Sequence, residues 1–307
     1  MAFLYALPGA VAEGLIWGLM AIGVYISYKI LDIADLTVDG SICTGACVCA
    51  VLLGLGVPVW ICVPAALLTG ALAGTVTGLL HTLLGIPSIL AGILTQLMLY
   101  SVNLVILGGK SLMAVDHRAN VLLVHMSNNP MAIVAMIAMV AVTIIVLWQF
   151  FYTEVGLTLK STGDNPDMSR AQGVDVNRNK VIGLAIANGI VAMAGAMLAQ
   201  YKGSANINDG RGAIVIALAA IFIGLSVSLK IKPNFVVSLI GVVSGGVVYY
   251  IVYNFVILLG LKTDYLKMLS AVIVALFLGV PYMKAEYFTK QKMPQPNAKQ
   301  SGGKADA

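Results

Sequence analysis

The segment Asp35-Leu36-Thr37-Val38-Asp39-Gly40-Ser41 separates two apolar stretches, and Asn206-Ile207-Asn208-Asp209-Gly210-Arg211-Gly212 separates two others. Each Asp-Gly pair follows one apolar stretch and opens a short one. Because Asp favours helix entrances and Gly favours turns, both segments predict a break between helices. The residues of the two predicted turns are Asp39, Gly40, Asp209 and Gly210.

Nine apolar segments surround these breaks. They are Ala10–Tyr28, Leu36–Leu53, Val59–Leu84, Ile86–Leu107, Met131–Tyr152, Val181–Gln200, Ala213–Leu229, Phe235–Leu258 and Leu266–Met283. A helix needs about 20 residues to cross a bilayer, so the second and seventh segments are short for a crossing. We expect an all-α polytopic membrane protein with about nine transmembrane segments, two of them short or broken.

The composition supports the same fold class. Hydrophobic residues make up 60% of the 307 residues, and charged residues make up 10%. Soluble domains contain about 25% charged residues. The 31 charged residues of this chain are too few to cover the surface of a soluble protein of its length. The continuous apolar stretches also exclude a membrane β-barrel, whose strands alternate polar and apolar residues.

The two breaks predict an internal repeat of inverted topology. One span precedes each Asp-Gly turn, a short span opens at the turn, and two more spans follow. The four spans of residues 10–107 therefore match those of 181–283 in inverted orientation. Broken helices in corresponding halves are typical of transporters. The alternative is a chance coincidence of two turns. The predicted permease domain covers 1–285, with a connecting span at 131–152, a loop at 153–180 and a disordered tail at 286–307.

The acids at the breaks have two interpretations. Asp35, Asp39 and Asp209 suit the first turn of a helix, where a carboxylate accepts free backbone N–H groups. A contact with a transported solute is the alternative. We favour capping, because it requires no ligand.

The distribution of Lys and Arg predicts the orientation. If the C-terminus is cytoplasmic, 12 basic residues fall inside and 6 outside. Basic residues are enriched on the cytoplasmic side, so we expect the N-terminus outside and an inner bacterial membrane location. The net charge of +5 reflects this orientation and does not indicate nucleic-acid binding.

The inner loop 153–180 is the most polar part of the chain. Asp164 or Asn165 can cap a short helix, Pro166 fits its first turn, and Gly173 can end it. A helix this short and polar needs a partner surface. An ordinary solvated connector is the alternative.

This loop resembles the coupling loop of ABC importer permeases of the branched-chain amino acid and ribose class. The resemblance rests on Gly163-x-Asn165-Pro166, the small and basic residues after it, and Gly173-Val174-Asp175-Val176. The segments Asp35–Ser41, His81–Thr95 and Asn206–Ile223 also look like this family. The tryptophan/tyrosine-type amino-acid uptake permeases are the most similar subgroup.

The resemblance implies a homodimeric importer subunit without a cofactor of its own. A separate ATPase would bind ATP and Mg and would contact Asn165, Pro166, Met168, Arg170, Ala171 and Gly173. A solute-binding protein would dock on the outer face. The solute would be an amino acid, aromatic or branched-chain, and the chain would not be an enzyme.

The residues themselves offer no other chemistry. No Ser/His/Asp set or metal-ligand spacing occurs, and Gly108-Gly109-Lys110-Ser111 lacks the first Gly of a nucleotide-binding loop. No acid falls in the middle of a predicted span, which argues against an ion-coupled secondary transporter. That class, or a channel, stays as the alternative.

Polar residues within apolar segments are the candidates for lining a path. They are Thr37, Ser41, Thr44, Gln96, Asn103, Asn188, Gln200 and Asn206. Gln96, Tyr100 and Asn103 share one helix face at i, i+4 and i+7. Hydrogen bonding between helices is the alternative role for all of them.

Overall fold

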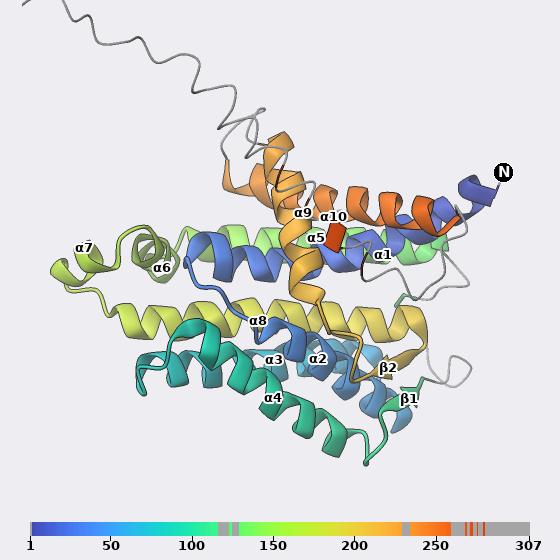
Figure 1. The fold of residues 1–307 in the computed structure, drawn as a ribbon, viewed down its shortest axis with the longest axis horizontal. Helices are drawn as coiled ribbons and strands as arrows, with labels where there is room; N and C mark the ends of the chain where they lie inside the picture. Colours follow the sequence, from blue (N-terminus) through green and yellow to red (C-terminus); the bar gives the residue numbers. More distant parts are fainter. Residues whose placement is uncertain are drawn as a thin grey trace, which may run out of the picture.

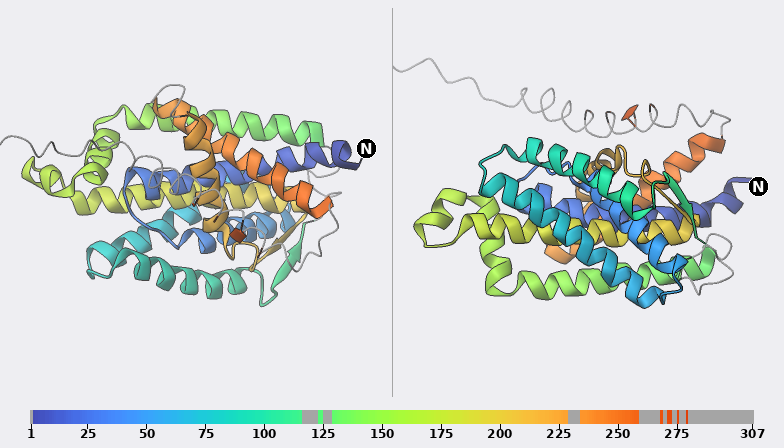
Figure 2. Two further views of the ribbon diagram at one scale, coloured as in Figure 1. Left: turned by 45° about the horizontal axis from the view of Figure 1, so that its top comes forward. Right: turned by 90° about the horizontal axis from the view of Figure 1, so that it is seen from below.

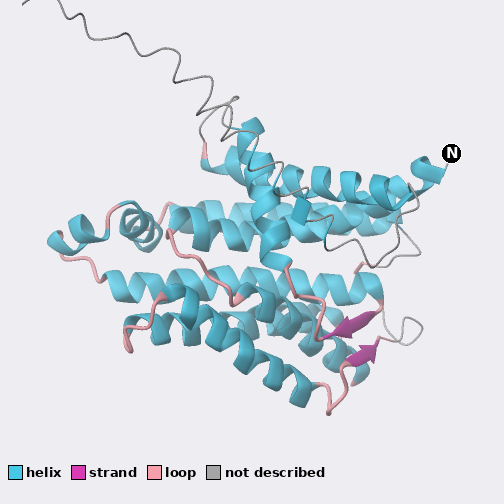
Figure 3. Cartoon of the chain, viewed as in Figure 1, coloured by secondary structure: helices cyan, strands magenta, loops and turns pink. Residues whose placement is uncertain are grey.

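The computed structural model describes residues 2–115, 123–124, 129–228 and 234–258, with isolated positions at 268, 271, 272, 275 and 279. These residues are almost entirely helical, with one short strand pair (Figure 3). The elements are α1 Ala2–Tyr25, η1 Ile26–Ile30, α2 Val38–Gly54, α3 Val59–Thr82, α4 Ser88–Ile106, β1 Leu112–Ala114, α5 Asn129–Phe151, α6 Glu154–Asp164, α7 Pro166–Ala171, α8 Val176–Lys202, β2 Ser204–Asn206, α9 Ala213–Ser228 and α10 Phe235–Leu258.

Six helical segments in the described part of the chain are long and apolar enough to span a membrane: α1 continued by η1, α3, α4, α5, α8 and α10. The helices α2 and α9 have only 17 and 16 residues. The second and seventh predicted segments are therefore short, as expected. The ninth, Leu266–Met283, lies outside the described residues except for isolated positions, and so does the tail 286–307.

The helices α1 and α8 run through the middle of the bundle, and α4 and α5 lie on opposite sides of it (Figure 2). Burial follows this arrangement. In the most apolar window, 83% of the α1–η1 residues are buried, against 28% for α4 and 33% for α5. Most exposed side chains of α5 are apolar, as a helix that contacts lipid requires, and most of those of α4 are apolar as well.

Glycines allow the central helices to approach closely. A Cβ added at Gly70 or Gly74 of α3 would collide with the α8 backbone at Asn188 or Leu184. One at Gly246 of α10 would lie 2.9 Å from the Gly14 oxygen of α1. Small residues at helix crossings replace the hydrophobic driving force that is missing within lipid. The four-residue glycine repeat of α3 thus packs inside one subunit.

The chain leaves helical geometry after η1. A π-helical turn ends at Ile30, and Asp32 adopts a left-handed φ of +55°. The next residues, 33–36, form no helix or strand before α2 begins at Val38. Irregular backbone inside a membrane protein must be buried in protein or line a wet cavity. The first predicted break is therefore present, and its unwound part begins before Asp35.

The bundle has two distinct ends. Figure 1 shows α6 and α7 at one end and the paired strands β1 and β2 at the other. The strands are antiparallel, with Leu112 opposite Asn206 and Ala114 opposite Ser204. They join the segment after α4 to the segment after α8, so both segments lie on the same side. The sequence did not predict these strands.

Candidate functional site

The two Asp-Gly turns contact each other in the folded chain. The Asp39 carboxylate accepts hydrogen bonds from the backbone N–H groups of Gly212 and Ile214, each at 2.9 Å. The Gly210 N–H donates to the Cys43 sulfur at 3.1 Å. A Cβ at Gly210 would collide with the Asp39 carbonyl oxygen, so the contact requires glycine. The segments 35–41 and 206–212 therefore form one structural unit.

The acids cap helices, but not in the expected way. Asp39 lies in α2 yet caps α9. Gly212, one of the two residues whose N–H group it accepts, is 173 residues further along the chain. Asp35 accepts the Thr37 N–H at 2.9 Å just before α2. The expectation that Asp209 caps its own helix is wrong: its carboxylate forms an ion pair with Lys202 at 3.8 Å. Local sequence indicated capping, whereas the helix that is capped depends on the tertiary fold.

A second group of polar side chains lies buried between α2, α3 and α8. Asn188 donates to Asp35 Oδ2 at 2.6 Å and accepts from the Ser41 hydroxyl at 2.6 Å. The hydroxyl oxygens of Thr37 and Thr77 are 2.7 Å apart. All five side chains are at most 2% exposed. We call these residues the Asn188 network. Three of the predicted path residues, Thr37, Ser41 and Asn188, thus bind helices together.

The Asn188 network weakens the argument drawn from the absence of acids in the middle of the predicted spans. Asp35 follows the first span in sequence, but its partner Asn188 is the thirteenth of the 27 residues of α8. Asp35 is only 2% exposed. The unwound segment carries this carboxylate back into the bundle, so the absence of mid-span acids does not argue against secondary transport.

A pocket opens between α2, α4 and the segment before α9. Its volume is about 350 Å³, within the usual range for ligand pockets of about 300–1,000 Å³. We call it the α2–α4 pocket; it is lined by Asp39, Gly40, Cys43, Gln96, Leu97, Tyr100, Asn103, Ile207 and Arg211. The helix face predicted from Gln96, Tyr100 and Asn103 therefore lines a cavity.

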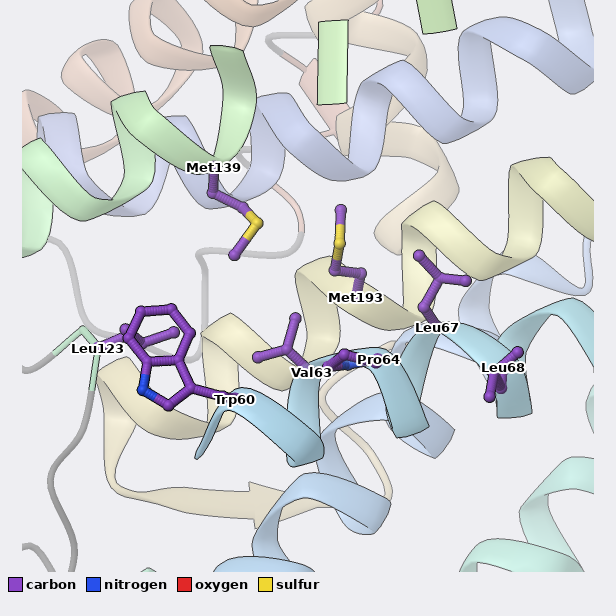
Figure 4. A pocket seen from close by; sticks show the side chains of 8 residues that line it. All are labelled: Trp60, Val63, Pro64, Leu67, Leu68, Leu123, Met139 and Met193. Carbon is purple, nitrogen blue, oxygen red and sulfur yellow. The ribbon is translucent and has the colours of Figure 1, made fainter. Parts of the chain in front are cut away.

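The α2–α4 pocket differs from two other cavities in the described part of the chain. The cavity in Figure 4, about 410 Å³, is lined by Trp60, Val63, Pro64, Leu67, Leu68, Leu123, Met139 and Met193. A neighbouring cavity of about 380 Å³ between α3, α5 and α8 shares Leu67, Met139 and Met193 with it. Both are lined almost entirely by apolar side chains, unlike the α2–α4 pocket.

The remaining path candidates have local roles. The Thr44 hydroxyl donates to the Gly40 carbonyl one turn earlier at 3.0 Å. Asn206 lies in β2 and accepts the Asn208 N–H at 2.9 Å. Gln200 accepts the Leu123 N–H at 3.2 Å. None of these three residues lines the α2–α4 pocket. Conversely, the sequence analysis did not select Arg211, although it lies in the second Asp-Gly segment.

The predicted short helix is α7. The Asn165 side chain accepts the Met168 N–H at 3.0 Å, Pro166 occupies the first turn, and Gly173 has a φ of +82° after the end. The start and end predicted from sequence are confirmed. Asn165, Pro166, Met168, Arg170, Ala171 and Gly173 are all exposed. Arg170 is not free, because it pairs with Asp167 at 3.3 Å.

A preceding helix, α6, attaches α7 to the bundle. A Cβ at Gly163 would collide with the Ile30 carbonyl oxygen of η1, so α6 lies directly on the end of the first span. Asn179 of α8 donates to the Thr162 hydroxyl at 3.0 Å. The sequence analysis treated this stretch as part of a loop. Thr153 is the N-cap of α6, and its hydroxyl accepts the Gly156 N–H. This residue could have predicted the start of α6 from the sequence.

Two further residues join the elements at this end. The Lys180 ammonium lies 3.2 Å from His81 Nε2, and His81 Nδ1 lies 2.8 Å from the Ile86 carbonyl oxygen. The turn between α3 and α4 is thereby tied to the start of α8. The four cysteines are buried and unpaired, and the described residues contain no His, Cys, Asp and Glu cluster that could hold a metal ion.

The described chain is thus a helical bundle with an exposed capped helix at one end and a polar pocket within it. A protein-family model described as "Branched-chain amino acid transport system / permease component" matches residues 9–280. The chain belongs to this permease family. It is the membrane subunit of an ABC transport system, and subunits of this family are not themselves catalytic.

Similar proteins agree with this assignment. The tyrosine transport system permease protein of Clostridioides difficile is 35% identical over 87% of this chain and 88% of its own length. The ribose import permease protein RbsC of Escherichia coli is 25% identical over 79% of this permease and 75% of its own length. The uncharacterized protein RP368 of Rickettsia prowazekii is 29% identical over 90% of this permease and 97% of its own length. No solved structure matches.

Proposed function

We propose that this permease forms, as a homodimer, the membrane-spanning part of an importer of an amino acid, aromatic or branched-chain. An ATPase would bind at α7 and a solute-binding protein at the opposite end. The observation that carries the proposal is the family match combined with α7, whose exposed face has no partner within the described chain. The amino acid is suggested by the printed names of the family and of the tyrosine permease.

A chain of contacts supports α7 as the coupling element. Asn165 both ends α6 and caps α7, so the two helices meet without a flexible linker. Gly163 of α6 packs on the backbone of η1 at Ile30, and η1 leads through residues 31–37 into α2. Movement of the ATPase against α7 would thus reach α2 and the α2–α4 pocket through packed backbone.

Helix packing supports the inverted repeat. Exchanging α1 with α8, α2 with α9 and α3 with α10 converts three of the main contacts into other observed contacts. The pair α3–α8 becomes α10–α1, α2–α8 becomes α9–α1, and α2–α3 becomes α9–α10. A twofold relation between the halves would produce this correspondence. The fourth span of the second half falls in residues 266–283, outside the described part.

The charges at the two ends of the bundle support the proposed orientation. The end with α6 and α7 carries Lys160, Arg170, Arg178 and Lys180, together with Lys29 at the end of the first span. An excess of basic residues favours the cytoplasmic side. We therefore assign α7 to the cytoplasm and β1 and β2 to the outer face.

Substitution of Ala171 tests the coupling role. Ala171→Glu places an unpaired anion on α7, which costs several kcal/mol if that surface is buried against a partner without a counter-charge. We expect the ATPase to be lost on co-purification while membrane insertion is retained. Asn208→Glu, with the same charge on an exposed residue at the other end, should retain the ATPase. Equal retention by both variants would remove the coupling assignment and favour an ion-coupled transporter.

Cysteine labelling tests the orientation separately. Ala171→Cys and Asn208→Cys are exposed positions at opposite ends, and the four described native cysteines are buried. In intact cells, an impermeant thiol reagent should label position 208 and not position 171. The reverse pattern would invert the topology but leave the permease assignment intact.

A further inference from the structure

The α2–α4 pocket contains a buried acceptor without a partner. Asn103 is only 1% exposed, and its Oδ1 atom has no hydrogen-bond partner among the residues that the structure describes. Leaving a buried acceptor unpaired costs about 1–3 kcal/mol. Native proteins rarely retain such a cost, so this atom, in a residue that lines a polar cavity, indicates a donor supplied from outside the chain.

The same pocket contains a cation that is not neutralised. Arg211 lines the pocket and is exposed, and within the described chain no carboxylate lies at ion-pair distance from it. The nearby Asp39 carboxylate instead accepts the Gly212 and Ile214 N–H groups. The guanidinium is therefore available for an external anion, and a carboxylate matches its planar pair of donors.

Resting on the proposed importer function, we propose that the α2–α4 pocket is a binding site for a free α-amino acid with an apolar or aromatic side chain. Its carboxylate pairs with Arg211, and its ammonium donates to Asn103 Oδ1. The Asp39 carboxylate, which also lines the pocket, adds the negative potential that an ammonium requires. Leu97, Tyr100 and Ile207 provide the apolar surface for the side chain.

The charge pattern discriminates between solute classes. A neutral sugar can use Asn103, Gln96 and Tyr100 but leaves Arg211 without an anion. A zwitterion satisfies both the cation and the buried acceptor. The pocket is thus a second point of selection within the membrane, separate from any selection by a solute-binding protein.

Protection from thiol labelling tests the site. Leu97 is 63% exposed and lines the pocket, so Leu97→Cys introduces a reactive thiol there. The permease and its ATPase, co-purified in lipid nanodiscs, are labelled with a small cationic methanethiosulfonate. We expect L-tyrosine or L-leucine to slow labelling by 1 + [L]/Kd, about elevenfold at ten times Kd. D-ribose should give no protection.

Three comparisons make the result specific. Adding Arg211→Gln to Leu97→Cys should abolish protection, whereas Arg211→Lys, which keeps the charge, should restore part of it. Trp60→Cys, in the apolar cavity of Figure 4, should show no protection by either amino acid. Unaltered permease gives the background from native cysteines.

The outcomes separate this inference from the proposed function. ATP-dependent uptake of L-tyrosine or L-leucine without protection at position 97 would overturn the site and leave the importer assignment standing. Protection by D-ribose equal to that by the amino acids would overturn the ligand class. Protection that survives Arg211→Gln would exclude carboxylate recognition by Arg211. Absence of ATP-dependent uptake of any tested solute would instead overturn the proposed function.

Discussion

The Asn188 network and the α2–α4 pocket contain similar side chains but differ in how their polar atoms are satisfied. In the network, the Asn188 amide uses both its oxygen and its nitrogen, on Ser41 and Asp35. In the pocket, Asn103 is just as buried, yet its oxygen has no partner among the described residues. Both asparagines lie within apolar helices, so residue type and burial do not distinguish them.

The difference separates two uses of polarity inside a membrane protein. Satisfied groups between α2, α3 and α8 hold helices together where the hydrophobic effect gives no driving force. Polar groups without protein partners around a cavity bind water. A polar solute can replace that water and bind to the same groups. Hydrogen-bond partners therefore separate the polar residues that join helices from those that are candidates for contact with a solute.

Asn188→Leu should have the largest effect on stability. It removes the donor to Asp35 and leaves a buried carboxylate short of a partner, which costs about 3–5 kcal/mol. We expect a strongly lowered melting temperature and poor yield of monodisperse permease in detergent. Asn103→Leu is the matched control and should melt no lower than the unaltered permease. Similar losses at both sites would erase the distinction between network and pocket.

Gly210→Ala should have the next largest effect, because the added Cβ collides with the Asp39 carbonyl oxygen. Overpacking of this kind costs about 1–3 kcal/mol. Gly40→Ala faces the Leu99 side chain at 2.9 Å, which can move, so a smaller loss is expected. Melting temperatures of both variants measure this order, and the opposite order would show that the two turns are not tightly packed together.

Asp39→Ala removes the cap of α9 and should cost about 0.5–2 kcal/mol. Asp209→Ala loses only a partly exposed ion pair with Lys202, which contributes about 0–1 kcal/mol. Thermal unfolding followed by size-exclusion chromatography compares the two. If Asp209→Ala proves the more damaging, the assignment of Asp39 as the cap of the other half is wrong.

A small effect is also expected for Thr77→Val, which removes the hydrogen bond to Thr37 and costs about 0.5–1.5 kcal/mol. A double-mutant cycle with Thr37→Val isolates the coupling between the two hydroxyls. Full additivity would mean that the contact at 2.7 Å adds nothing to the network.

Sequence reasoning was most successful where structure is local. The start of α7 followed from Asn165 and Pro166, and its end from Gly173, because a cap and its helix are neighbours in the chain. The shortness of α2 and α9 followed from the length of their apolar runs. The face of Gln96, Tyr100 and Asn103 followed from helical spacing alone. The stretch of α6 was missed, because its polar composition masked the Thr153 cap.

Reasoning failed where the partner was distant in sequence. Asp35 meets Asn188 across 153 residues, and Asp39 caps α9 across more than 170. For Thr37, Ser41 and Asn188, the sequence left two roles open, lining a path or hydrogen bonding between helices, and only the structure shows their hydrogen bonds to distant residues. Arg211 had no local pattern to distinguish it from a surface arginine.

The sequence by itself determined that the chain is a helical membrane protein, that the segments of α2 and α9 are short, and where the exposed helix α7 begins and ends. Hydrophobicity, helix period and capping act over one to five turns, so they can be read from neighbouring residues. Only the tertiary structure decided which acid caps which helix, which polar groups satisfy one another, and which are left facing a cavity. These are decided by contacts between segments from 40 to more than 170 residues apart, which form only when the helices pack together.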